Sequence, residues 1–76
     1  MNSGVIKKKT VVYEIVDRLI ALIQSGAFKP GERLPSERKL CETFQVSRSS
    51  LRTALQQLEY NGIIETRKGS GTYICK

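Results

Sequence analysis

Only about three residues, around Val46, separate two amphipathic segments in the middle of the chain. Apolar residues recur at helical spacing in both segments: Leu40, Cys41 and Phe44 before the break, and Leu51, Ala54, Leu55 and Leu58 after it. So short a link between two helices is typical of a helix-turn-helix. The break therefore limits the chain to folds in which two short helices pack closely on a shared core.

Serines mark where these two helices begin. Ser36 and Ser47 each precede a helical pattern, and a serine hydroxyl there can accept hydrogen bonds from free backbone N–H groups. We expect helices over about residues 36–45 and 47–60, and Gly62 closes the second one.

An earlier segment, residues 10–25, has the pattern of a third helix. Its apolar side chains lie on one helix face: Val12, Ile15, Val16, Leu19, Ile20 and Ile23. Gly26 stands where a helix C-terminus places a left-handed residue. The Pro-Gly pair that follows fits the central positions of a type II turn over residues 29–32, and residues 33–34 fit a short strand.

The hydrophobic period changes toward the end of the chain. Residues 63–67 and 72–75 are rich in β-branched and aromatic side chains, and residues 68–71 between them form a flexible basic turn. The predicted fold is mainly α with a small β-hairpin, a winged helix-turn-helix of three helices plus a wing. We expect residues 10–76 to form this single domain and residues 1–9, with three lysines, to be a flexible basic tail.

Composition limits the functions open to so short a chain. Its 76 residues allow one domain with a small core, and 13 Lys and Arg against 7 Asp and Glu give a net charge of +6. That balance suggests a polyanionic partner, nucleic acid first. The chain has no histidine, no Cys-x-x-Cys pair and no nucleophile or phosphate-loop pattern, so we expect no enzyme, no metal site and no cofactor. Cys41 and Cys75 suit a reducing cytoplasm, and no apolar run is long enough to span a membrane.

The polar side of the 47–60 helix is the predicted binding surface. On a helical wheel, Ser49, Arg52 and Gln56 fall roughly opposite the apolar stripe, with Arg48 toward the flank. In the DNA major groove, an arginine fork can pair with a guanine edge, and Gln56 can pair with adenine. Hydroxyls that suit phosphate contacts gather at the helix start: Ser47, Ser49 and Ser50. The open alternative is a solvated helix face with two surface arginines.

Two other elements fit the same partner. Arg38, in the first turn of the 36–45 helix, is placed to reach a phosphate or a base edge, although an arginine there is more often a surface charge. The hairpin tip is slim and basic, and such a tip can approach the minor groove. The tip residues predicted to contact DNA are Lys68, Gly69, Ser70 and Gly71. An ordinary glycine-containing hairpin is the alternative, and the order of three helices followed by a basic wing favours DNA binding.

These motifs form a chained pattern over residues 26–40, 46–48, 51–58, 61–64 and 68–73. The pattern resembles the DNA-binding domain of GntR-family bacterial transcription regulators, and the resemblance covers about residues 10–75. It implies a winged helix that binds palindromic operators in double-stranded DNA as a homodimer. By position, DNA-contacting arginines of the family match Arg38, Arg48 and Arg52, and Gly69 matches the wing tip that reaches the minor groove. The three serines match hydroxyl positions near phosphates.

The chain departs from the family pattern at two places. Gln45 replaces a glycine often found before the Val-Ser-Arg motif, and a left-handed backbone there would cost glutamine on the order of 1 kcal/mol. Family members also continue into a C-terminal domain that binds an effector and holds the dimer together. Since the sequence stops at Lys76, we expect a fragment of a longer regulator.

The resulting hypothesis is sequence-specific DNA binding by the DNA-binding domain of a bacterial transcriptional regulator, a cytoplasmic repressor. Its recognition helix would occupy the major groove and its wing the minor groove. The homodimer would form on DNA or through the C-terminal effector domain. The alternative is a winged-helix protein-interaction module whose basic face binds an acidic partner.

Overall fold

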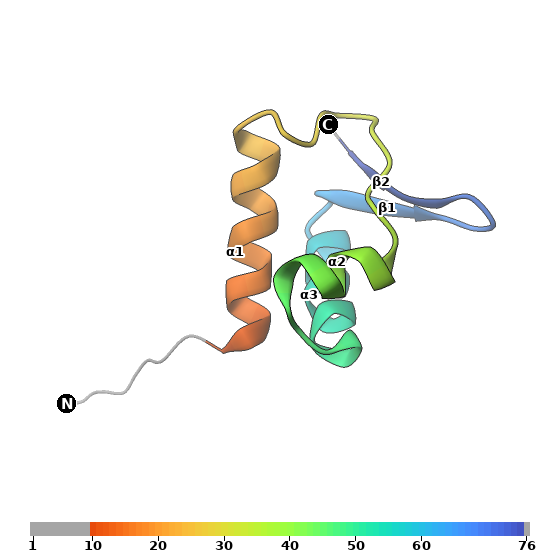
Figure 1. Cartoon of the computed structure of the whole chain (residues 1–76). Coiled ribbons are helices and arrows are strands. Elements are labelled where there is room, and N and C mark those ends of the chain that lie inside the picture. Colours follow the sequence, from red (N-terminus) through yellow and green to blue (C-terminus); the bar gives the residue numbers. More distant parts are fainter. Residues whose placement is uncertain (1–9, 76) are drawn as a thin grey trace.

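Three helices precede an antiparallel hairpin in the computed structural model, which describes residues 10–75. The elements are α1 (Val11–Gln24), α2 (Glu37–Phe44), α3 (Arg48–Tyr60), β1 (Ile64–Arg67) and β2 (Gly71–Ile74). Figure 1 shows α1 standing on one side of the α2–α3 pair, and the hairpin projects on the other side. The predicted winged helix-turn-helix is confirmed. The basic tail predicted at residues 1–9 lies outside the described residues.

Side-chain caps begin all three helices. Ser36 Oγ accepts a hydrogen bond from the backbone N–H of Lys39 at 3.1 Å, and Ser47 Oγ accepts one from Ser50 N–H at 3.2 Å. Thr10 caps α1 in the same way. Each bond satisfies one of the N–H groups that the first helical turn leaves unpaired, so the predicted starts of α2 and α3 are confirmed.

Left-handed residues end the helices. Gly26 after α1 and Gly62 after α3 have φ of +89° and +75°, as predicted for helix-closing glycines. Gln45 closes α2 with φ 57° and ψ 52°, and it is the one non-glycine residue with positive φ between residues 10 and 75. The position before Val46 is therefore left-handed, and glutamine occupies it at a cost of about 1 kcal/mol.

The core forms between the helices and the base of the hairpin. Ten apolar side chains are buried: Ile15, Leu19, Leu34, Leu40, Phe44, Leu51, Ala54, Leu58, Ile64 and Ile74. Leu55, the remaining member of the predicted α3 stripe, is half-buried at its edge. Because one side of α3 is anchored in this core, its opposite side is left exposed.

The loop between α1 and α2 is hydrogen-bonded to the hairpin. The turn over residues 29–32 forms as predicted, and the predicted short strand is a single antiparallel bridge from Arg33 to Tyr73. Leu34 N–H also donates to Thr72 O at 2.8 Å. These bonds hold the start of α2 beside the wing.

The structure corrects three predicted strand boundaries by one residue each: β1 begins at Ile64 instead of residue 63, and β2 covers Gly71–Ile74 instead of residues 72–75. Gly71 was predicted in the turn, but it pairs with Arg67 as the first residue of β2. Ser70 N–H donates to Arg67 O at 2.9 Å and closes the loop after three residues, 68–70, so that Gly71 already lies opposite Arg67.

Candidate nucleic-acid interface

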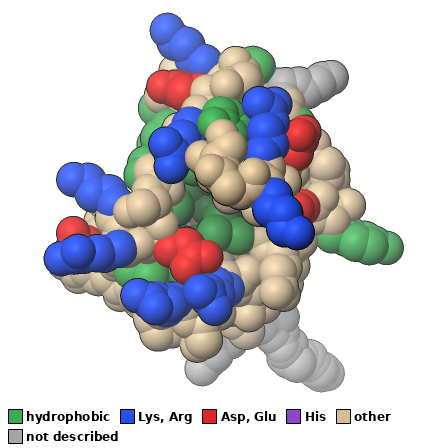
Figure 2. All heavy atoms as spheres, turned by 90° about the vertical axis from the view of Figure 1, so that its right-hand side faces the viewer, with side chains coloured by type: hydrophobic (Ala, Val, Ile, Leu, Met, Phe, Trp, Pro, Cys, Tyr) green, Lys and Arg blue, Asp and Glu red, His purple; other side chains and the backbone are tan. Residues whose placement is uncertain are grey.

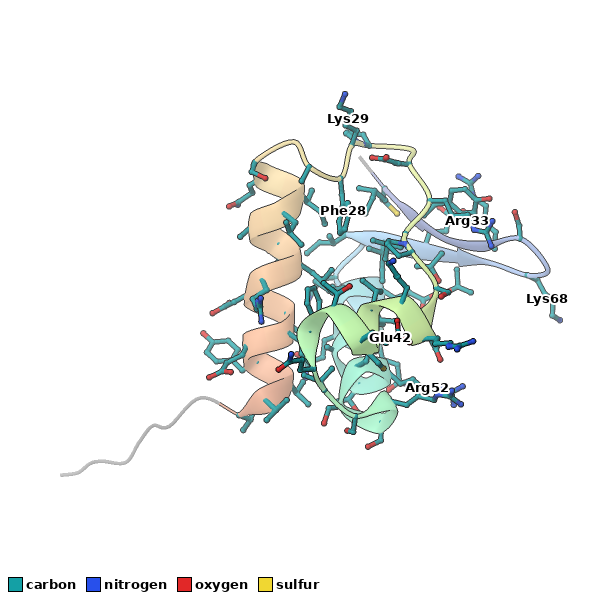
Figure 3. The ribbon with its side chains drawn as sticks, viewed as in Figure 1. Phe28, Lys29, Arg33, Glu42, Arg52 and Lys68 are labelled. Carbon is teal, nitrogen blue, oxygen red and sulfur yellow. The ribbon has the colours of Figure 1, made fainter. Side chains whose placement is uncertain are left out.

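One side of the molecule carries the start of α2 and the projecting hairpin. Figure 2 looks onto this side and shows Lys and Arg side chains spread across it, with acidic side chains in smaller number among them. In Figure 3, Arg33, Arg52 and Lys68 all extend toward it from three different elements. We call this side the basic face. Its cations belong to the loop before α2, to α3 and to the wing, so tertiary packing brings them together.

The start of α3 carries Arg48 and a cluster of three serine hydroxyls. Ser47 Oγ lies 3.0 Å from Ser50 Oγ and 3.4 Å from Ser49 Oγ. Arg48 is exposed and forms no ion pair within residues 10–75. The serines are therefore held by their capping contacts, while the Arg48 guanidinium is available to a partner.

Arg52 is tied to α2. Its Nε lies 3.1 Å from Glu37 Oε1, and the two side chains are 59% and 40% exposed. The sequence alone did not indicate this pairing between Arg52 and Glu37. The ion pair restrains Arg52 at the junction of the two helices and places a carboxylate within the basic face.

Arg38 and Gln56 lie at different places around this junction. Arg38 Nε is 3.7 Å from Glu42 Oε2 one turn later on α2, and its side chain is 84% exposed. An ion pair this exposed leaves the guanidinium free to move.

Gln56 lines a shallow hollow along the later part of α3, together with Thr53, Gln57, Tyr60 and Asn61. Gln56 is therefore set apart from the serine cluster.

Side-chain contacts stiffen the wing. Arg67 pairs with Glu65 at 3.1 Å and stacks over the Tyr73 ring at 4.3 Å from its centre. The Tyr73 hydroxyl lies 2.7 Å from Ser70 Oγ. Ser70 is thus tied to the strand behind it, whereas Lys68 extends outward from the tip (Figure 3). Sequence reasoning did not identify the role of Tyr73, because its contacts depend on the hairpin register.

Arg33 is a further cation that sequence reasoning missed. It is exposed, and it lines a small recess together with Ser36, Glu37 and Gly71. Its position next to the buried Leu34 in an extended segment is the signal that could have placed it on the outer side. The recess connects the start of α2 with the start of β2.

Other kinds of site are not found in the described part of the chain. No three His, Cys, Asp or Glu side chains gather there as metal ligands, and both Cys41 and Cys75 are free. None of the helices there has the length and apolarity needed to cross a bilayer.

Comparison with known proteins gives a consistent picture. Residues 12–74 match the family described as bacterial regulatory proteins, gntR family. The mannosyl-D-glycerate transport/metabolism system repressor MngR of Escherichia coli (strain K12) is 44% identical over 66 residues, covering 87% of this chain and 28% of MngR. The chain spans between 24% and 31% of the length of the first curated relatives that it matches.

Solved structures share the fold. The structure of Streptococcus agalactiae GntR superimposes with a TM-score of 0.77 at 41% identity, covering 87% of this chain and 32% of that one. The AraR DNA-binding domain in complex with operator ORE1 gives a TM-score of 0.84 at 25% identity, covering 90% of this chain and 83% of that one.

Proposed function

Because the chain belongs to the GntR family of bacterial regulatory proteins, in which it corresponds to the winged-helix DNA-binding domain, we propose that it binds operator DNA through its basic face. The observation that carries this proposal is the convergence of Arg52 on α3 and Lys68 on the wing toward one side (Figure 3). A helix start and a wing tip on the same side can engage a major groove and the neighbouring minor groove of one duplex. The AraR domain of the same fold is in complex with operator DNA, which supports this partner.

In this proposal, the start of α3 reads the bases. Arg48 lies in the first turn of α3 and Arg52 in the second. Both are exposed, on the part of the helix that does not pack against the core. A guanidinium fork pairs with guanine O6 and N7 in the major groove, and Gln56, further along, is assigned to adenine. The ion pair with Glu37 limits the orientations of Arg52, so that less side-chain freedom is lost on binding.

Other groups on the basic face position the duplex. Hydroxyl and cationic side chains are assigned to phosphates: Arg38, Ser47, Ser49, Ser50 and Lys68. The wing tip, with Gly69 at its turn, is assigned to the minor groove. Ser70 contributes mainly by bracing the tip through Tyr73, and Gly71 lies behind the tip in β2. Contacts to phosphates fix register, while base contacts give specificity.

At the level of the whole regulator, we propose that two copies bind a palindromic operator and that residues 10–76 act as one DNA-binding domain beside a separate effector-binding domain. The chain covers less than a third of its curated relatives, and this difference leaves length for such a domain in them. The name of MngR supports a repressor. The domain would act in the cytoplasm by binding alone, without catalysis or a cofactor.

Selection of bound sequences from a random duplex pool tests this function. The 76-residue chain should enrich a palindromic sequence, because two copies related by a twofold axis read inverted half-sites. Enrichment of a single half-site would support DNA reading and contradict dimeric binding. No enrichment, with no binding to random duplex at low salt, would contradict the proposed function.

A further inference from the structure

Arg33 lies outside the helix-turn-helix and outside the wing loop, yet it belongs to the basic face. Its backbone forms the bridge to Tyr73, and its side chain extends toward the same side as Lys68 and Arg52 (Figure 3). The recess that it lines with Glu37 and Gly71 has a volume of about 180 Å³. Arg33 is therefore located where the helix-turn-helix meets the wing.

Gly71 makes room for the Arg33 side chain. A Cβ atom added to Gly71 would lie 2.6 Å from Arg33 Nε and 3.3 Å from both Cζ and Nη2. Real Cβ atoms do not approach other atoms as closely as 2.6 Å, so the Arg33 side chain occupies the space that a Cβ atom at position 71 would need. Any side chain at position 71 would push it away.

Arg33 differs from three other arginines of residues 10–75 in its lack of an ion pair there. Arg38, Arg52 and Arg67 each pair with a glutamate, but Arg33 has no ion pair with any of residues 10–75. Its guanidinium is therefore positioned by packing while its hydrogen-bond donors are open to a partner. A planar fork of this kind matches the oxygens of a phosphate in a bidentate manner.

We propose that Arg33 binds a DNA backbone phosphate and that the absence of a side chain at Gly71 lets its guanidinium occupy this place. With α3 in the major groove and the wing at the adjacent minor groove, the sugar-phosphate strand that separates the two grooves must pass between them. The Arg33 recess is lined from the start of α2, from α3 and from the start of β2, so in this arrangement it would face that strand. This role rests on the proposed function and adds a phosphate contact to it.

The test compares Arg33→Met with Lys29→Met in the 76-residue chain. Each variant removes one positive charge and keeps an unbranched side chain, but Lys29 projects from the turn before α2 in a different direction (Figure 3). Affinity is measured by fluorescence anisotropy, at several salt concentrations, for a duplex selected from a random pool and for a scrambled duplex. Thermal unfolding monitored by circular dichroism confirms that both variants are folded.

Loss of one phosphate contact has a defined signature. Arg33→Met should weaken binding to both duplexes by the same factor and lower the slope of log affinity against log salt by about 0.9. The factor by which Arg33→Met binds more weakly than the unmodified chain should therefore shrink roughly threefold between about 50 and about 200 mM salt. Arg33→Lys, which keeps the charge without the planar fork, should retain the slope and lose part of the affinity. Lys29→Met should leave the slope unchanged.

The outcomes separate this inference from the proposed function. If the unmodified chain binds neither duplex at low salt, the proposed function fails first. If it binds, and Arg33→Met has the same affinity and slope as Lys29→Met, the phosphate contact is wrong while DNA binding stands. A loss confined to the selected duplex would assign Arg33 to a base and overturn the inference. If Arg33→Met unfolds, the Arg33→Lys variant provides the test. A reduced affinity in Arg33→Lys supports the bidentate phosphate contact, and an affinity equal to that of the unmodified chain contradicts it.

Discussion

Glu37 at the start of α2 and Arg52 in α3 form an ion pair across the helix-turn-helix, with 3.1 Å between Glu37 Oε1 and Arg52 Nε. The pair joins residues 15 positions apart in the sequence and places a carboxylate beside one of the cations of the basic face. Its partial exposure limits its contribution to the free energy of unfolding to about 0.2–1 kcal/mol. Its larger effect is on how Arg52 is presented to DNA.

Glu37→Gln should therefore change DNA binding more than stability. Removing the carboxylate eliminates repulsion of phosphates and raises affinity for a scrambled duplex, while Arg52 loses the contact that orients it. We expect the ratio of affinities for selected and scrambled duplexes to fall. Anisotropy titrations with both duplexes measure this ratio.

Glu42→Gln is the matched control for that experiment. Glu42 pairs with Arg38 at 3.7 Å, and both side chains are well exposed. Glu42→Gln removes the same charge from α2 and leaves the Arg52 ion pair intact. Affinity should therefore rise for both duplexes, and the ratio of affinities for the selected and scrambled duplexes should stay unchanged. Equal ratios in the two glutamine variants would contradict an orienting role for Glu37.

Arg48→Ala should reduce specific binding. If the guanidinium forms a paired contact with a base edge, its loss costs roughly 1–3 kcal/mol of operator affinity and relaxes the sequence preference at that position. Because Arg48 is exposed at the helix start without an ion pair inside residues 10–75, unfolding should occur at nearly the same temperature. Repeating the pool selection with the variant measures the preference. Operator affinity equal to that of the unmodified chain would contradict the contact.

Lys68→Ala should affect all sequences alike. Lys68 extends from the wing tip, and the Arg67, Tyr73 and Ser70 contacts that stiffen the wing do not involve its side chain. Loss of a phosphate contact should weaken binding to all sequences by the same factor. It should also lower the slope of log affinity against log salt by about 0.9. Salt titrations on selected and scrambled duplexes provide the measurement. Lost discrimination with an unchanged slope would show that Lys68 acts on bases.

Local features of the sequence predicted most of the fold. Helix ends are set by contacts over three or four sequence positions, as at Ser36, Ser47 and Gly62. A short stretch of sequence is therefore enough to predict them. The apolar stripe of α3 was equally local, since helical spacing alone places Leu51 and Leu58 on one face. The end of the wing loop was misplaced by one residue because hairpin register depends on pairing across strands, which composition does not determine.

The candidate site was less predictable than the fold. The α3 residues could be named from a helical wheel, but the contact of Arg52 with Glu37 requires the crossing of two helices. The packing of Arg33 on Gly71 joins positions 38 apart, and it exists only because the loop before α2 pairs with β2. Both contacts arise from tertiary structure, which periodicity and turn preferences do not report.

Gln45→Gly should stabilise the chain. Gln45 ends α2 with φ 57°, a conformation that crowds the Cβ of an L-residue and that glycine adopts freely. Relief of this strain should raise the free energy of unfolding by about 1 kcal/mol, which corresponds to roughly 4–8 °C in Tm for a domain of this size. Gln45→Ala is the control, because alanine keeps the Cβ and should give no such gain. Equal Tm values for the glycine and alanine variants, measured by thermal unfolding, would show that the left-handed turn between α2 and α3 stores no strain.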